Sequence, residues 1–331
     1  ALDLQPGDTV IVPSLTFLAT ASAPTYVGAE VVFSDVDPST GLMTKEHLAE
    51  AIARSNGNVR AVFPVHLSGA CVDLAQIGAV AREHNLSIVD DACHAIGAAW
   101  CDEPIGCGRR SAMSIFSMHP VKTIAMGEGG AITTADPVLA ERLRRYRNHG
   151  MVRDPARFLQ PSEAFDSDGV LNPWYYEMPT PGFNYRASEI NCALGLSQLA
   201  KLDQFVERRR QIADLYDVLL RPAFPLLSTP VRNPNCRSGW HLYPVQIDFE
   251  SAGISRANLM NKLRQKGIGT QVHYLPVHRQ PYWRSRQPGV VLPGADEYYA
   301  RCLSLPLFPA MTNDDVAFVA RELLDALPAR Y

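Results

Sequence analysis

The chain has 331 residues, of which 47% are hydrophobic and 20% are charged. This composition is typical of a globular protein and excludes a disordered, collagen-like or coiled-coil chain. The 31 basic and 34 acidic side chains give a net charge of −3, so no basic excess favours nucleic acid or an anionic membrane as partner. No apolar run approaches the roughly 18 to 20 residues that span a bilayer, and we expect a cytoplasmic protein.

The cysteines and histidines do not form a metal-binding or disulfide pattern. Seven cysteines are an odd number without a Cys-x-x-Cys pair, and the nine histidines show no His-Glu-x-x-His motif. We therefore predict no metal and expect reduced, mostly buried thiols. The cysteines are Cys71, Cys93, Cys101, Cys107, Cys192, Cys236 and Cys302.

Short β-branched runs alternate with helical patterns over the first 150 residues. This alternation predicts an α/β fold with a mainly parallel central sheet and helices on both faces. The predicted strands are residues 10–12, 31–33, 60–65, 87–89, 114–116 and 131–134. The predicted helices are residues 44–54, 74–83 and 137–147. Ligands of such sheets bind at the carboxyl ends of the strands.

The second half of the chain is less regular. Residues 151–183 are rich in Pro, Gly, Asp and aromatic side chains, and the aromatic triplet 174–176 favours a packed loop. A helical apolar period then predicts one long helix from 187 to about 220. Beyond it we predict strands at 242–247 and 270–273 and helices at 255–266 and 314–327. We therefore expect a large domain over 1–220 and a small α+β domain over 221–331.

One segment contains a lysine directly after an apolar run. In residues 114–131, Lys122 is followed by Gly127, Gly129 and Gly130. A lysine in a desolvated pocket can act as a Schiff-base nucleophile, because desolvation lowers its pKa. Taken alone, the segment leaves open a solvated loop lysine beside an ordinary turn.

A second segment ends an apolar run with two acids, Asp90 and Asp91. An aspartate here can cap a helix, or it can pair with a protonated heterocycle. Asp91 precedes Lys122 by 31 residues (122 − 91), so we expect the two at the carboxyl ends of different strands of one sheet. Pyridoxal 5′-phosphate requires such a pair, because the lysine holds its aldehyde and the carboxylate keeps its pyridine nitrogen protonated.

Five stretches, in order along the chain, resemble the pyridoxal-phosphate sugar aminotransferases of the fold-type I superfamily. They are residues 13–21 (PSLTFLATA), 91–97 (DACHAIG), 116–122 (FSMHPVK), 127–131 (GEGGA) and 182–186 (GFNYR). Within that family, residues 148–151, 174–177, 183–199 and 271–278 are most similar to the transaminases of pseudaminic acid biosynthesis. The resemblance implies the fold-type I fold and pyridoxal 5′-phosphate as cofactor.

The resemblance also implies the roles of three catalytic residues. Lys122 would hold the cofactor and move protons between the two carbons of the substrate imine. Asp91 would pair with the pyridine nitrogen. His94 stands where the family contacts the phenolic oxygen of the cofactor, although a core histidine bonded to backbone is the alternative.

Further residues would bind the cofactor. The resemblance implies that Phe17 stacks on the pyridine ring, with a buried strand-end phenylalanine as the alternative. Ser117 would donate its hydroxyl to the phosphate, and Asn184 would reach the phosphate in the partner subunit's site. Arg186 would support that contact, or it would be solvated.

The sugar site is less defined by the sequence. Six side chains could stack on sugar or uracil, or could equally pack an irregular loop: Trp174, Tyr175, Tyr176, His273, Tyr274 and His278. The run Glu207-Arg-Arg-Arg210 invites a diphosphate interpretation, but on a long helix a solvated face is favoured. The family has a Gly/Ser-Thr phosphate-binding loop at a helix N-terminus that would lie upstream of Asp8, and we expect this chain to lack that segment.

The function expected from the resemblance is transamination of a UDP-linked 4-keto-6-deoxy-N-acetyl-hexosamine to the 4-amino sugar. L-Glutamate is the expected donor, and a homodimer with shared active sites is implied. Three alternatives stay open. One is another nucleotide-sugar aminotransferase, and the second is a non-catalytic homologue that binds cofactor or sugar. The third, the related sugar 3-dehydratase, replaces the lysine with histidine, and Lys122 argues against it.

Overall fold

The computed structural model describes residues 1–327, and a six-stranded sheet lies at its centre in the order β2-β1-β3-β4-β7-β8. Neighbouring strands are parallel except β7 and β8, which confirms the mainly parallel α/β sheet. The strands are β1 (Asp8–Pro13), β2 (Glu30–Ser34), β3 (Asn58–Val62), β4 (Ser87–Asp91), β7 (Met113–Ser117) and β8 (Gly130–Thr133).

Side chains alternate between the two faces along each strand, and at the centre of the sheet, in β1, both faces are buried. In β1, Ile11 packs on one face with Leu48 of helix α2 (Lys45–Arg54) and Ile77 of helix α3 (Leu74–Glu83). Its neighbours Val10 and Val12 pack on the opposite face, in a cluster that includes Tyr298 from the C-terminal part of the chain. The predicted arrangement of helices on both faces is thereby confirmed.

The helices of the large domain begin where side chains can cap them. Thr44, Asp73 and Asp136 accept backbone hydrogen bonds at the starts of α2, α3 and α4. The predicted helices therefore match the observed ones closely. Helices of this half are α1 (Leu18–Thr25), α2 (Lys45–Arg54), α3 (Leu74–Glu83) and α4 (Pro137–Arg147). Across residues 1–327, no helix combines the length and the apolar character needed to traverse a bilayer.

The long helix predicted over 187–220 is wrong, because two helices occupy this range. They are α6 (Glu189–Leu199) and α7 (Leu202–Leu220). The backbone leaves the helical region at Lys201, with φ −102° and ψ 1°. The break has no Pro or Gly to mark it, and the apolar period continues across it, so the sequence pattern does not reveal it.

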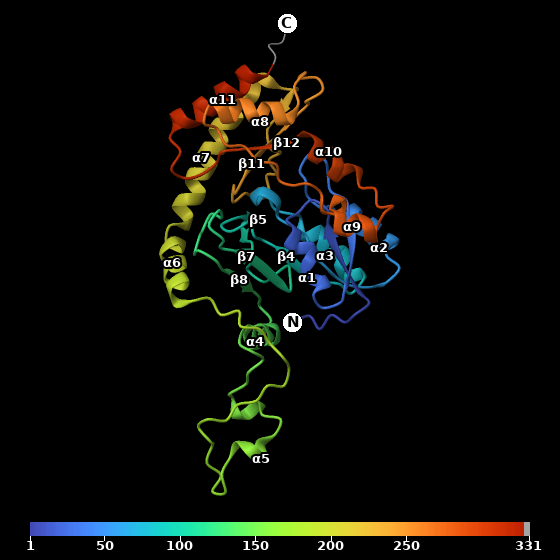
Figure 1. Cartoon of the computed structure of the whole chain (residues 1–331), viewed down its shortest axis with the longest axis vertical. Coiled ribbons are helices and arrows are strands. Elements are labelled where there is room, and N and C mark those ends of the chain that lie inside the picture. Colours follow the sequence, from blue (N-terminus) through green and yellow to red (C-terminus); the bar gives the residue numbers. More distant parts are fainter. Residues whose placement is uncertain (328–331) are drawn as a thin grey trace.

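The C-terminal part has its own sheet, with the order β12-β11-β9, near the C-terminus in Figure 1. Its core includes Tyr216, Tyr243 and Leu259, contributed by α7, β11 and α8. The predicted strand 270–273 is wrong, since only Gln271 forms a single bridge, to Ser304. The elements are β9 (Leu227–Ser228), β11 (Tyr243–Ile247), α8 (Arg256–Gln265), α9 (Pro281–Arg286), α10 (Pro293–Arg301), β12 (Cys302–Leu305) and α11 (Asn313–Ala326).

A third, small sheet joins the two halves of the chain. Its order is β10-β5-β6, and β10 (Cys236–Arg237) pairs antiparallel with β5 (Ala99–Trp100). The remaining strand is β6 (Glu103–Pro104). The segment that leads into β11 is therefore fixed against the large domain. A domain division near residue 220 stays a prediction.

Residues 151–183 extend away from the body as an arm that carries α5 (Pro161–Ala164), as Figure 1 shows. The expectation of a packed aromatic loop is wrong for most of the triplet, because Trp174 is 74% and Tyr176 is 52% exposed. Only Tyr175 is held, by a contact of its ring with Phe158 and a hydrogen bond to the Gln160 carbonyl. The arm has too few apolar neighbours within its own chain to bury these rings.

Candidate active site

Asp91 and Lys122 lie at the same edge of the central sheet. Asp91 ends β4 and is paired in register with Ile115 of the adjacent parallel strand β7. Lys122 follows β7 in the loop 118–129 that leads to β8. The predicted placement of the two residues at the carboxyl ends of different strands is confirmed. Since parallel strands end at one edge, their side chains share one site.

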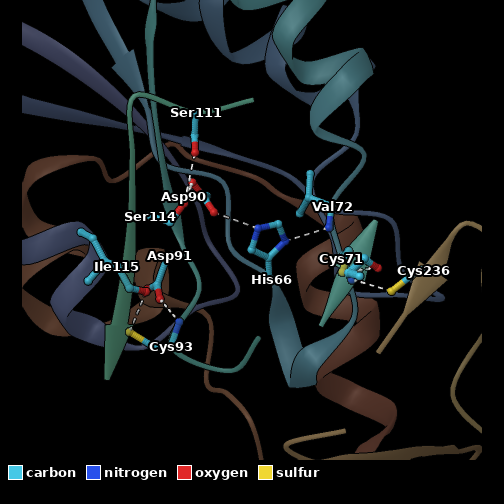
Figure 2. Close-up of polar contacts among 11 residues, drawn as sticks. His66, Cys71, Val72, Asp90, Asp91, Cys93, Ser111, Ser114, Ile115 and Cys236 are labelled. Atoms are coloured by element: carbon cyan, nitrogen blue, oxygen red, sulfur yellow. Dashed lines mark hydrogen bonds and ion pairs between the residues drawn. The ribbon is translucent and has the colours of Figure 1, made fainter. Parts of the chain in front are cut away.

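Asp91 is fixed from two directions. Its Oδ2 accepts a 2.6 Å hydrogen bond from the Thr20 hydroxyl, and its Oδ1 accepts a 3.0 Å bond from the backbone amide of Cys93. The Thr16 hydroxyl lies 2.8 Å from that of Thr20. Figure 2 shows the contact between Asp91 and Cys93. A carboxylate offers about four lone-pair positions, so Asp91 can still accept a further hydrogen bond.

The environment of Lys122 weakens its positive charge. Burial lowers the pKa of Lys122, while nearby Cys93 and Asp91 act in the opposite direction. Burial raises the pKa of the Cys93 thiol above its ordinary value, so this thiol is neutral near pH 7. Of these two neighbours, only Asp91 carries a negative charge that stabilises the protonated form of Lys122. A partly desolvated amine beside a carboxylate suits proton transfer.

Asp91 and Lys122 belong to a cluster of polar side chains that also contains His94, His241, His273 and Tyr274. His94 is a neutral member of this cluster. Burial lowers its pKa well below the ordinary value, and the charges of His241, Lys122 and His273 add to this shift. The backbone amide of Ser68 donates to His94 Nδ1 over 3.2 Å, so the ring proton is on Nε2. That nitrogen lies 3.1 Å from the Tyr274 hydroxyl and donates to it.

His241 is a member of this cluster for which the sequence carries no signal. Its ring centroid lies 4.5 Å from that of His94, and burial lowers its pKa well below the ordinary value. Arg209 holds the segment from which it projects, by donating to the carbonyls of Trp240, His241 and Leu307 over 2.8–3.1 Å. Arg209 is 5% exposed, so the predicted solvated face is wrong for this arginine.

Of the three predicted sugar-site residues in the segment 271–278, His273 and Tyr274 lie in the cluster and His278 does not. His273 hydrogen-bonds through Nδ1 to the Ser304 hydroxyl at 2.8 Å, and burial and the Lys122 charge lower its pKa to about 4. Tyr274 contacts His94, as described. His278, by contrast, is buried against Ser14, with 2.6 Å between Nδ1 and Oγ. It fills a polar position in the core.

Asp90 points away from this site into a separate buried network, drawn in Figure 2. The backbone amide of Val72 donates to His66 Nδ1 over 3.0 Å, so His66 Nε2 donates to Asp90 over 3.2 Å. The Ser114 hydroxyl donates to the same carboxylate over 2.8 Å. Although burial opposes it, these bonds lower the pKa of Asp90. The two adjacent acids thus differ in role because strand side chains alternate.

Phe17 lies beside Tyr274 of the cluster, and Ser117 ends the strand that precedes Lys122. Phe17 precedes α1, is 59% exposed and lies 6.2 Å from the Tyr274 ring between centroids. Its exposure contradicts the alternative of a buried strand-end phenylalanine. Ser117 is half-buried at the end of β7. The exposed face of Phe17 can stack on a flat ring.

The structure does not place Asn184 and Arg186 at this cluster. Both are exposed; the backbone of Asn184 bridges Asn148, and Arg186 donates to the side chain of the same Asn148. Trp174 and Tyr176 lie on the arm. Within one chain, these residues contact neither Asp91 nor Lys122.

The donor set fits pyridoxal 5′-phosphate. The amine of Lys122 is the group that can hold the aldehyde, and Asp91 retains accepting capacity for a protonated ring nitrogen. Phe17 offers an uncovered aromatic face and Ser117 a hydroxyl at the strand end. All four residues belong to the stretches 13–21, 91–97 and 116–122 that resemble the family.

The model of the DegT/DnrJ/EryC1/StrS aminotransferase family matches residues 1–324. The chain belongs to this family. It is therefore a pyridoxal-phosphate-dependent sugar aminotransferase, as predicted, with the fold-type I architecture of its relatives.

Individual relatives cover nearly the whole aminotransferase chain. The spore coat polysaccharide biosynthesis protein SpsC of Bacillus subtilis (strain 168) is 37% identical over 329 residues, which are 98% of this chain and 80% of SpsC. The structure of Helicobacter pylori PseC, an aminotransferase involved in the biosynthesis of pseudoaminic acid, matches with a TM-score of 0.85 and 26% identity, over 97% of this chain and 80% of PseC. The PMP-form of Spr1654 from Streptococcus pneumoniae, a putative sugar aminotransferase by its description, matches with a TM-score of 0.83 and 25% identity, over 98% and 83% of the two chains.

Proposed function

We propose that the enzyme transfers an amino group from L-glutamate to the C4 ketone of a UDP-linked 4-keto-6-deoxy-N-acetyl-hexosamine, in pseudaminic acid biosynthesis. The observation that carries the chemistry is the pair of Lys122 and Asp91 at adjacent strand ends. The choice of substrate is supported by the similarity to PseC over 97% of the chain and by the sequence stretches at 148–151, 174–177 and 271–278.

In the proposed mechanism, pyridoxal phosphate supplies an electron-accepting ring and an aldehyde that carries the amino group between substrates. Lys122 Nζ would take the α-proton of the amino-acid donor and return it to the other carbon of the imine. In the second half of the reaction it would carry out the reverse exchange on the sugar. Its lowered pKa keeps more of the amine in the neutral, proton-accepting form. Asp91 keeps its negative charge toward the ring nitrogen, and Thr20 with the Cys93 amide holds that carboxylate in place.

His94 is assigned a contact to the phenolic oxygen of the cofactor. Its neutral form can donate only from Nε2, because Nδ1 accepts the Ser68 amide. The Tyr274 hydroxyl accepts the hydrogen bond from Nε2 and can donate its own toward the ligand, so His94 would act on the phenolic oxygen through Tyr274. Phe17 covers the ring, and Ser117 donates its hydroxyl to the phosphate.

We further propose a homodimer in which Asn184 reaches the cofactor phosphate in the partner's site, supported by Arg186. The support is a set of apolar side chains on and before α6 that are exposed in the single chain. A second copy of the chain would bury them. These side chains are Phe183, Tyr185, Ile190, Leu194, Leu196 and Leu199. On the same proposal the enzyme works in the cytoplasm, where the unpaired cysteines would stay reduced.

A second candidate substrate is favoured by the higher identity to SpsC, at 37%. On this alternative the same chemistry acts on another nucleotide-linked keto sugar, one destined for a surface polysaccharide. The catalytic roles of Lys122 and Asp91 would be unchanged. Only the side chains that contact the sugar would differ.

The deciding experiment incubates the full-length enzyme and cofactor with L-glutamate and a panel of UDP-linked 4-keto sugars. The amino-sugar product is identified by mass spectrometry and NMR. Amination at C4 of the 6-deoxy-N-acetyl-hexosamine supports the proposal, and preference for another keto sugar supports the alternative. Lys122→Ala is the control and should give no turnover. Substantial activity in that variant would overturn the assigned role of Lys122.

A further inference from the structure

We propose that Cys71 and Cys236 form a peroxide-sensitive thiol pair that closes to a disulfide and ties the segment carrying His241 to the large domain. Cys71 follows the turn η1 (Leu67–Gly69), and Cys236 begins β10. The two cysteines are 165 residues apart in sequence. This inference concerns oxidation of the protein itself and does not depend on the identity of the sugar.

The two cysteines are already in contact, and Figure 2 draws the hydrogen bond that joins the Cys71 backbone to the Cys236 sulfur. The backbone amide of Cys71 donates to Cys236 Sγ over 3.1 Å, and the side chains of the two cysteines share a hydrogen bond. The Ala99 carbonyl lies 3.6 Å from the Cys71 sulfur and is the alternative acceptor for the single thiol proton of Cys71. The pairing of Cys236 with Trp100 in β5 holds the second cysteine in position. Disulfide formation requires side chains that approach in this way.

In this pair, Cys236 is the nucleophile that reacts with peroxide, and Cys71 is the resolving thiol that closes the disulfide. The hydrogen bonds from Cys71 lower the pKa of Cys236. The hydrogen bond to Cys236 and burial both raise the pKa of the Cys71 thiol. Cys236 is also half-buried, whereas Cys71 is buried. The more exposed, more acidic thiol is therefore the one that meets an oxidant.

A cavity of about 740 Å³ gives the oxidant access. Cys71 and Cys236 both line it, together with Arg232, Arg237 and Ser68. Among the residues that the structure describes, Lys122 and Asp91 do not line this cavity, so it is separate from the candidate active site.

The reaction consumes one molecule of hydrogen peroxide and releases two of water. The Cys236 thiolate attacks one peroxide oxygen, the O–O bond breaks, and Cys236 becomes a sulfenic acid while hydroxide takes up a proton to leave as water. The Cys71 sulfur then attacks the Cys236 sulfur, and the S–O bond breaks. The proton of Cys71 leaves with the hydroxide as the second water. Both sulfurs are oxidised and peroxide is reduced.

The bond would fix the segment that runs from β10 to His241. Gly239 in this segment already donates to the Gly69 carbonyl over 3.1 Å, and His241 contacts His94. A covalent link across 165 residues of sequence also restricts the unfolded chain. We expect oxidation to raise the Tm by about 3–6 °C for a protein of this size.

The test treats the full-length holoenzyme with hydrogen peroxide, blocks free thiols with N-ethylmaleimide under denaturing conditions and maps peptides by mass spectrometry. We expect a peptide linked through Cys71 and Cys236 in the wild type, together with a dithiothreitol-reversible rise in Tm. The linked peptide and the Tm rise should persist in Cys101→Ser, which alters another cysteine of the same cavity. Both should be lost in Cys236→Ser.

Three outcomes would overturn the proposal. In the first, both cysteines remain labelled by N-ethylmaleimide after peroxide treatment. In the second, Cys236 advances to a sulfinic acid while Cys71 stays free. In the third, Cys236 links to Cys101 instead. Because Cys236 is half-buried, Cys236→Ser should fold, and the comparison does not depend on replacing the buried Cys71.

Discussion

Thr20 and Asp91, 71 residues apart in sequence, are joined by a 2.6 Å hydrogen bond from hydroxyl to carboxylate. Thr20→Val removes this bond while keeping the shape of the side chain. A hydrogen bond to a charged group contributes about 1.5–3 kcal/mol, so we expect kcat/KM to fall by roughly 10- to 100-fold, as measured by steady-state kinetics. Thr25→Val is the matched control, because Thr25 on the same helix bonds only to the Ser22 carbonyl. Equal losses in both variants would contradict a role through Asp91.

The pKa of Lys122 can be measured without turnover. Reductive methylation of the apoenzyme reacts with neutral amines, so its rate at Lys122 should reach half-maximum below the ordinary 10.5. Asp91→Asn removes the anion that raises the pKa of this lysine, and labelling near pH 8 should become faster. Exposed Lys45 serves as the internal reference in both proteins. Slower labelling of Lys122 in Asp91→Asn would contradict the electrostatic argument.

His273 should make the protein less stable in acid. An unfolded histidine binds a proton below about pH 6.5, whereas His273 in the folded protein does so only below about 4. The unfolded state therefore binds more protons between these values, and stability falls as the pH drops through this window. His273→Gln should recover roughly 2 kcal/mol of that loss, seen as a smaller fall in Tm from pH 7 to pH 4.5.

For this measurement, His84→Gln is a suitable control, because His84 is exposed at the end of α3. It should retain the wild-type dependence of Tm on pH. A His273→Gln curve parallel to that of the wild type would refute the assignment.

Arg209 should matter far more for stability than its neighbour Arg210. Arg209→Met leaves three buried carbonyls without their donor, and we expect a loss of roughly 3 kcal/mol in the free energy of unfolding. Among the residues that the structure describes, Arg210 pairs with Glu207 of its own helix at the surface. Arg210→Met should therefore change the free energy of unfolding by less than about 0.5 kcal/mol. Urea denaturation measures both values. Similar losses in the two variants would show that the carbonyl contacts contribute little.

The proposed dimer face can be tested at Ile190, which is 84% exposed in the single chain. Ile190→Glu places a charge on α6 where a second copy would bury it, so a dimer should shift toward monomer by about 10-fold or more in Kd. Analytical ultracentrifugation measures this shift. Val218→Glu, at a position 69% exposed on α7, should leave assembly unchanged. If the wild type is a monomer at all concentrations, the dimer proposal is wrong.

Local sequence signals predicted the parts of the fold that short-range chemistry decides. Apolar runs marked β1, β2, β4 and β7, and helical patterns marked α2, α3 and α4, where Thr44 and Asp73 cap the first two in the structure. The placement of Asp91 and Lys122 followed from strand order along the chain. The strand predicted at 270–273 failed, because only Gln271 pairs with β12, through a single bridge to Ser304, and one bridge does not make a strand.

Long-range contacts explain what the sequence could not reveal. Arg209 looks like its exposed neighbours in a charged run, and only the fold turns it toward Trp240 and Leu307. His241 joins His94 across 147 residues (241 − 94), and no spacing rule signals such a pair. Thr20 lies in a recognisable stretch, but its hydroxyl meets Asp91 only after β4 is aligned beside α1.

Asn191, on the first turn of α6, donates its side-chain amide to the carbonyls of Met126 over 2.6 Å and Glu128 over 3.2 Å, in the loop that carries Lys122. The same helix presents the apolar side chains that a second copy would cover. A subunit that loses its partner would then also loosen the support under its lysine. If the proposed dimer forms through α6, specific activity should decline on dilution at the concentration where it dissociates, because one helix would then serve both assembly and the lysine loop.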